Sequence, residues 1–154
     1  MIFTDAIAPD FTLPDLDGRP VSLAHLRQAQ PTLLVFFKVS CPVCQMTLPF
    51  LNRLVPSGKL NVVTISQDGP MLTQRFRARF GVTVPALLDP EDRGYPVSNA
   101  YRITNVPSLF LVEPDGRISL AVNGFSKADL EKIGARAETE IFRRDEAIPA
   151  WRPG

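Results

Sequence analysis

The chain has 154 residues, of which 45% are hydrophobic and 21% charged, a balance typical of one soluble globular domain with a sizeable core. Its formal net charge of +1 gives no electrostatic reason to expect a nucleic-acid partner or an anionic membrane surface. No hydrophobic run approaches the roughly 18 residues of a membrane-spanning helix, and the first residues lack the features of a signal peptide, so we expect a cytoplasmic protein without a membrane partner.

The N-terminal part predicts a hairpin followed by a buried strand. Two short strands, 8–13 and 19–23, flank a turn at Asp17-Gly18, and their prolines place them at an edge or outside the main sheet. A short helix is expected over 24–28. The run 32–39 is hydrophobic on both faces, as in a strand buried within a parallel arrangement.

The rest of the chain alternates predicted helices and strands. In chain order we expect a helix from 42 to about 55, a strand 60–66, a helix 71–80, a strand 86–88, helical turns at 97–101, a hairpin of 108–112 and 117–122, and a helix from 126 to about 144. Pro49 should kink the first of these helices. The proline-rich end, 148–154, is expected to be irregular. This order predicts a single α/β domain, 1–154, with helices on both faces of a mixed sheet.

The only two cysteines, Cys41 and Cys44, stand where the buried strand ends and a helix begins. Pro42 suits the first helical position, because its missing N–H costs nothing there. Cys41 is therefore expected at a helix N-terminus, where free N–H groups and the helix dipole stabilise negative charge. A fall of its pKa from about 8.5 to about 7 would raise the thiolate fraction at neutral pH from roughly 3% to roughly half. Cys44 faces the same side one turn later, so it can resolve a mixed disulfide by bonding to Cys41.

Three other interpretations of the pair are a structural crosslink, a metal half-site and two inert core thiols. A ring of roughly four residues removes only about 2 kcal/mol of chain entropy, so a crosslink here would be weak. Zinc needs four ligands, and the single histidine, His25, lies in a different stretch, so only a dimer could share a site. The spacing and the strand–turn–helix setting favour redox chemistry.

The residues after the pair resemble the active-site helix of thioredoxins. That helix has the pattern C-x-x-C-x-M-x-x-P-x-L, which is matched here by Cys41, Cys44, Met46, Pro49 and Leu51. The resemblance implies that Cys41 is the nucleophile and Cys44 the resolving thiol.

Other segments are similar to redoxin-domain proteins, a group that includes the alkyl hydroperoxide reductase/thiol-specific antioxidant proteins and the thioredoxin-like cytochrome-maturation proteins. The likeness is carried by 8–23 and 106–118, and it covers about residues 6–135, leaving 136–154 outside. It implies a thioredoxin fold with an N-terminal β-hairpin extension. Val106-Pro107 resembles the family's cis-proline loop, so Pro107 would face Cys41 and the Val106 backbone would pair with an extended substrate segment.

The implied activity is that of a thiol–disulfide oxidoreductase in cell redox homeostasis and antioxidant defence. It needs no metal or organic cofactor, because the sulfur atoms carry the electrons. The implied partners are a disulfide-containing protein or a small-molecule disulfide, together with an electron-donor thiol system. We expect a monomer or a weak dimer.

Departures from the family pattern affect the walls and the proton chemistry of this site. Ser40 stands where thioredoxins have tryptophan, Val35 where they bury an aspartate, and Thr47 where the cytochrome-maturation type has glutamate. No side-chain base is therefore evident beside Cys44, which leaves water or Lys38. The Lys38 ammonium either points inward and stabilises the thiolate or is solvated at the strand end.

Peroxiredoxins are the nearest rival family. Their peroxidatic cysteine follows the pattern P-x-x-x-T-x-x-C, but Leu34 and Lys38 stand at the proline and threonine positions here. An atypical thiol peroxidase therefore remains an alternative, as does a noncatalytic redox-sensing module that changes a partner interface. Turnover of disulfide or hydroperoxide separates these functions.

Overall fold

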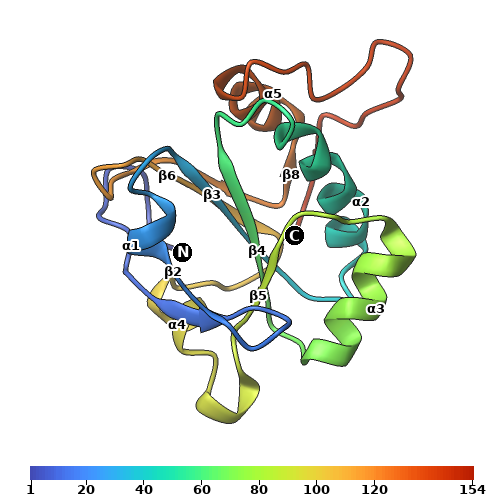
Figure 1. Ribbon diagram of the computed structural model, residues 1–154. Coiled ribbons are helices and arrows are strands. Elements are labelled where there is room, and N and C mark those ends of the chain that lie inside the picture. The colour runs from blue at the N-terminus through green and yellow to red at the C-terminus, as the bar shows by residue number, and fades with distance from the viewer.

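The computed structural model describes residues 1–154, and its centre is a five-stranded mixed sheet (Figure 1). Its strands are β3 (Thr32–Phe37), β4 (Asn61–Ser66), β5 (Ala86–Leu88), β6 (Ser108–Val112) and β7 (Ile118–Asn123). They lie in the order β5-β4-β3-β6-β7, with β3, β4 and β5 parallel and β6 and β7 antiparallel to their neighbours. The predicted α/β class and mixed sheet are confirmed.

The central strand β3 supplies side chains to both hydrophobic cores of the molecule. Leu33, Val35 and Phe37 lie in the core on one face, and Leu34 and Phe36 lie in the core on the other. All five are fully buried. Because successive side chains of a strand point to opposite faces, a run that is hydrophobic throughout is what a two-sided core requires.

Helices cover both faces of the sheet (Figure 1). The first face carries α2 (Pro42–Leu51), α3 (Pro70–Phe80) and α5 (Lys127–Arg136), whose buried side chains belong to the first core. The second carries α1 (Leu23–Leu26), α4 (Pro96–Ala100) and the N-terminal segment. Two short 3₁₀ helices, η1 (Asn52–Leu54) and η2 (Glu91–Arg93), complete the helical elements. None of the helices has the length and apolar character needed to span a lipid bilayer.

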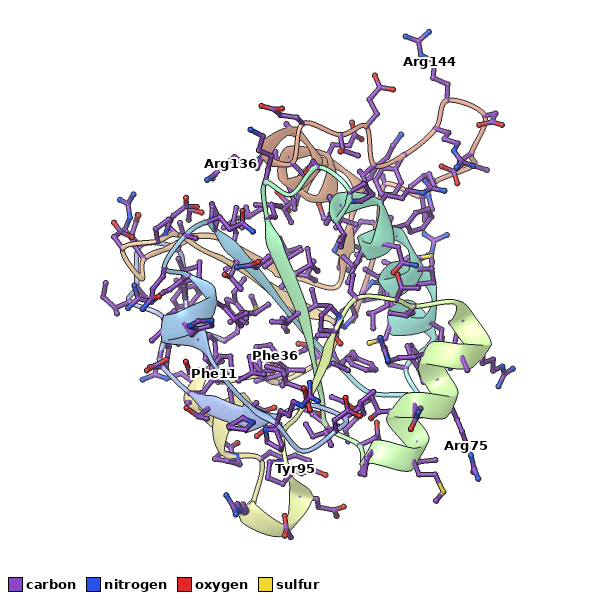
Figure 2. All side chains as sticks on the ribbon, viewed as in Figure 1. Phe11, Phe36, Arg75, Tyr95, Arg136 and Arg144 are labelled. Carbon is purple, nitrogen blue, oxygen red and sulfur yellow. The ribbon has the colours of Figure 1, made fainter.

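The N-terminal hairpin forms its own small sheet of β1 (Thr12–Pro14) and β2 (Pro20–Ser22), as its prolines predicted. The turn between them uses Gly18 with a φ of +81°, a conformation that glycine adopts without steric cost. Phe11, from the chain entering this hairpin, and Phe36 of the central strand, both labelled in Figure 2, pack against the ring of Tyr101. The hairpin is thus attached to the main sheet through the second core.

Two predicted helix ends need correction. The helix after Cys41 ends at Leu51 and continues as η1, and Pro49 lies within it. Helix α5 ends at Arg136, not near residue 144. It stops because Glu138 adopts a left-handed φ of +54° and the Thr139 N–H donates to the Gly134 carbonyl at 2.9 Å, which closes the last turn.

Residues 137–154, which we call the C-terminal strap, leave α5 and return to the body of the protein. The sequence predicted that the end of this strap, 148–154, is irregular, but part of it forms a strand. Trp151–Arg152 forms strand β9, which pairs antiparallel with β8 (Phe125–Ser126). In Figure 1 the strap is the red segment that loops outward and then runs back past α2 and β8.

Candidate active site

Cys41 lies at the N-cap of α2, directly after the turn that follows β3. Its backbone is extended, with φ −83° and ψ 114°, and Pro42 occupies the first helical turn. The Cys41 Sγ accepts a hydrogen bond from the Cys44 N–H at 3.1 Å. This sulfur therefore lies at the positive end of the helix dipole and accepts one of the free N–H groups of the helix.

Cys44 lies one turn into the same helix and is fully buried in the first core. Burial raises the pKa of the Cys44 thiol, and the hydrogen bond with Cys41 and the negative charge of Asp68 raise it further. A backbone hydrogen bond from Lys38 acts in the opposite direction. Both cysteines are free thiols, and Cys41 is the more accessible of the two. The pair thus consists of a reachable outer sulfur and a buried inner one.

The loop before β6 faces this pair. The Val106–Pro107 peptide bond is cis, as the resemblance implied. The Val106 carbonyl accepts a hydrogen bond from the Cys41 thiol at 3.4 Å, and the Pro107 carbonyl accepts the Gly124 N–H at 2.8 Å. The structure therefore brings together four of the predicted site residues: Cys41, Cys44, Val106 and Pro107.

The Lys38 ammonium takes no part in this cluster. Its residue is exposed, and its side chain forms none of the hydrogen bonds or ion pairs in the structure. Only its backbone contributes, since the Lys38 carbonyl accepts the Cys41 N–H at 3.3 Å and closes the turn. The side-chain geometry matches the solvated interpretation of Lys38.

Asp68 is a site residue that the sequence reasoning missed. It follows β4, and its Oδ2 accepts the Val39 N–H at 2.8 Å, which fixes the turn leading into Cys41. Asp68 lies between the predicted strand 60–66 and the predicted helix 71–80, in a stretch to which the sequence assigned no function. The signal that could have found it is topological: the carboxyl ends of neighbouring parallel strands meet at one edge, so residues after β4 approach residues after β3.

The positions that depart from the thioredoxin pattern supply no acid or base. Val35 is fully buried in the first core, and the Thr47 hydroxyl donates to the Val43 carbonyl within the same helix at 2.6 Å. Asp68 is thus the carboxylate whose charge acts on Cys44. No group of three or more His, Cys, Asp or Glu side chains is arranged to hold a metal ion.

Comparison with known proteins gives a family and a set of relatives. The model of the AhpC/TSA family matches residues 4–121. The thiol-disulfide oxidoreductase ResA of Geobacillus kaustophilus is 32% identical over 130 residues, which cover 81% of this chain and 72% of that protein. A Mycobacterium tuberculosis protein named as a candidate peroxiredoxin is 35% identical over 126 residues, covering 74% of this chain and 80% of its own.

Solved structures confirm the fold. The thioredoxin domain of a thiol-disulfide oxidoreductase from Bacteroides vulgatus superposes with a TM-score of 0.77 at 22% identity, covering 88% of this chain and 98% of that one. The thioredoxin fold predicted from the resemblance is therefore shown.

Proposed function

This chain belongs to the AhpC/TSA family and is a thioredoxin-like thiol–disulfide oxidoreductase, and we propose that it reduces disulfides through Cys41 as nucleophile and Cys44 as resolving thiol. The observation that carries the assignment of roles is the asymmetry of the pair. Cys41 is a partly exposed residue whose sulfur accepts the Cys44 N–H at 3.1 Å, whereas Cys44 is fully buried in the core. An incoming disulfide can therefore reach only the first.

The reaction proceeds in two exchanges. The Cys41 thiolate attacks one sulfur of the substrate disulfide, the bond between Cys41 and that sulfur forms, and the other substrate sulfur leaves and takes a proton. Cys44 then gives up its proton and attacks Cys41. The Cys41–Cys44 disulfide forms, and the second substrate thiolate leaves and is protonated. Two electrons have passed from the cysteine pair to the substrate, together with the proton of Cys44 and the proton that Cys41 lost to solvent when it became a thiolate.

The electron donor that regenerates the pair is proposed to be a cellular thiol system. It would return two electrons to the Cys41–Cys44 disulfide by the same exchange chemistry. Disulfide-containing proteins are the substrates of an oxidoreductase of this family, and a cytoplasmic location and a monomeric or weakly dimeric state stay predictions. Cell fractionation and sedimentation of the purified protein test the last two.

Serine substitution of each cysteine tests the roles. Cys41→Ser should abolish turnover of a disulfide substrate with dithiothreitol as donor. Cys44→Ser should instead stop after the first exchange and accumulate a mixed disulfide through Cys41, detected as an adduct by mass spectrometry. Ser40→Ala is the matched control, because it changes a neighbouring exposed residue without removing a sulfur. Wild-type turnover by Cys41→Ser would show that the assignment is wrong.

A thiol peroxidase is the second candidate, and the relative named as a candidate peroxiredoxin is the observation that favours it. The two residues that replace the peroxide-binding proline and threonine of peroxiredoxins argue against a peroxidase. Leu34 is fully buried in the second core and the Lys38 side chain is exposed, so neither offers a hydroxyl or a fixed ring beside Cys41. Consumption of hydroperoxide by the wild type at a rate exceeding that of disulfide reduction would favour the peroxidase.

A further inference from the structure

The last residues of the strap return to the loop that faces Cys41. The Lys127 N–H donates to the Ala150 carbonyl at 3.0 Å, and β9 then pairs with β8 through Phe125 with Arg152 and Ser126 with Trp151. This path carries residues 150–154, which we call the end segment, along the edge next to the cis-proline loop. Figure 1 shows the C-terminus near the centre of the molecule, beside α2 and β8.

Gly154 lies directly against the Val106 backbone. A Cβ added at Gly154 would lie 2.7 Å from the Val106 carbonyl oxygen, 3.1 Å from its carbon and 3.3 Å from the Asn105 Nδ2. Carbon atoms do not approach an oxygen so closely, so only a residue without a side chain fits here without a shift. The Val106 carbonyl is also the group that the Cys41 thiol contacts at 3.4 Å. The end segment and the reactive sulfur therefore meet the same peptide group.

A second glycine shows that the close approach extends back to Arg152. At Gly124, which follows β7, an added Cβ would collide with the Arg152 carbonyl oxygen and lie 3.0 Å from the Gly154 nitrogen. The Gly124 N–H in turn donates to the Pro107 carbonyl. The end segment is thus packed backbone against backbone with the residues that support the cis-proline loop.

The strap is anchored before it reaches this loop. The Arg53 guanidinium binds both carboxylate oxygens of Glu146, at 2.7 and 2.8 Å, and donates to the Ile141 carbonyl at 2.7 Å. Phe142 packs on Phe50 of α2 with ring centroids 5.0 Å apart. These contacts hold the middle of the strap on α2 and on η1, which directly follows it, so the fold positions the end segment.

We propose that the end segment occupies the edge of the active site on which an extended polypeptide substrate would lie, and so makes the protein discriminate against polypeptide disulfides relative to small ones. The inference rests on the proposed function. A polypeptide that pairs with the Val106 backbone must displace Gly154, whereas a small disulfide needs only the accessible side of Cys41. The apparent affinity for a polypeptide equals its intrinsic affinity multiplied by the fraction of molecules in which the end segment is displaced, so a small fraction means weak binding.

The test compares two disulfides of different size with the full chain and with variants of the end segment. Insulin serves as the polypeptide disulfide and hydroxyethyl disulfide as the small one, with dithiothreitol as donor. Deletion of residues 150–154 should raise kcat/KM for insulin by about three- to tenfold, through a lower KM, and change that for the small disulfide by less than about twofold. Gly154→Ala should change the insulin value in the same direction, because its Cβ pushes the end segment off Val106.

Arg152→Ala is the matched control, since its guanidinium bonds only to the adjacent Trp151 carbonyl and its backbone pairing is kept. It should behave as the wild type with both substrates. Unchanged or lower kcat/KM for insulin in the folded deletion variant, with activity on both substrates retained by the wild type, would overturn this inference alone. A wild type that reduces neither disulfide would overturn the proposed function instead.

Discussion

Cys41 and Cys44 are three residues apart in the sequence and meet different surroundings. The inner thiol is enclosed by the core, and burial raises its pKa above the ordinary value for cysteine. It therefore remains protonated in the resting protein, and the proposed second exchange requires that it lose this proton. Asp68, which fixes the turn before Cys41 through Val39, contributes to this state because its negative charge disfavours a second one nearby.

Substitution of Asp68 separates its charge from its hydrogen bond. Asp68→Asn keeps an oxygen that can accept the Val39 N–H, so the turn should persist, while loss of the charge should lower the pKa of Cys44. The rate at which Cys44 resolves a preformed mixed disulfide between Cys41 and glutathione depends on the Cys44 thiolate fraction, so it reports this pKa. At neutral pH this rate should be higher in Asp68→Asn than in the wild type.

Asp115→Asn is the control for this experiment, because Asp115 lies in the turn between β6 and β7 and does not act on Cys44. Asp68→Ala should in addition loosen the turn, which slower overall turnover would report. An equal resolution rate in Asp68→Asn and the wild type would show that the charge of Asp68 does not act on Cys44.

At the scale of elements, α2 does more than carry the cysteines. Its outer surface and η1 hold the strap, through Phe50 against Phe142 and through Arg53 against Glu146. The Arg53 guanidinium also stacks on the Phe50 ring at 4.9 Å. The α2 helix thus positions both cysteines and the strap that returns toward them. A change that weakens the contacts of the strap should therefore loosen the packing of the end segment against Val106.

Acid should release this anchor. The hydrogen bonds from Arg53, followed by that from the Arg143 backbone, lower the pKa of Glu146 from 4.5 to about 2. Because the folded-state pKa is the lower one, the stabilisation by Glu146 is complete above about pH 4.5 and is lost as the pH falls through about 2. Denaturation curves of the wild type and Glu146→Gln, measured across this range, should differ at pH 6 and converge toward about pH 2.

Glu140→Gln is the control for the acid experiment, because Glu140 lies in the same strap and forms no ion pair. It should follow the wild type at every pH. A difference between the wild type and Glu146→Gln that is as large at pH 2 as at pH 6 would contradict an ionic anchor.

At the scale of the whole molecule, the elements that the sequence predicted are those whose signals are local. The hydrophobic run of β3, the Asp17-Gly18 turn and the helix predicted over 71–80 each follow from residues close together in the sequence, and each is present. The exit of α5 and the path of the strap depend instead on contacts between distant residues. Arg53 and Glu146 are 93 positions apart, and no local pattern joins them.

The site divides in the same way. Cys41 and Cys44 were predictable because strand, proline and helix lie in one continuous stretch, and Pro107 because of a family resemblance. Asp68 was not, since its position beside the pair requires the register of β3 and β4, in which Phe37 lies opposite Ser66. For Lys38 the sequence spacing allowed either an inward or a solvated side chain, and could not decide between them. In the structure Lys38 is exposed at the end of the strand.

A hydrogen bond from Tyr101 in the second core holds the N-terminal segment on the sheet, and its contribution to stability can be measured. Tyr101 is fully buried against Phe36 and Phe110, and its hydroxyl donates to the Pro9 carbonyl at 2.7 Å. Tyr101→Phe leaves that carbonyl without its partner and should lower the free energy of unfolding by about 1–2 kcal/mol in urea denaturation.

Tyr95→Phe is the matched control for this prediction, because the Tyr95 hydroxyl makes no hydrogen bond and is partly exposed. Its effect should stay within about 0.5 kcal/mol. Equal stabilities of Tyr101→Phe and the wild type would mean that the Pro9 contact adds nothing to the docking of the N-terminal segment.

The Met1 side chain and Gly154, at the two ends of the sequence, both contact residues near the cis-proline. Met1 Sδ lies 3.5 Å from the Asn123 Nδ2 and 3.9 Å from the Ser108 Oγ, while Gly154 lies against Asn105 and Val106. A peptide fused after residue 154 would emerge beside Val106 and would crowd incoming molecules. Purification handles and fluorescent reporters are better inserted at the outer bend near Arg144, whose side chain projects into solvent in Figure 2.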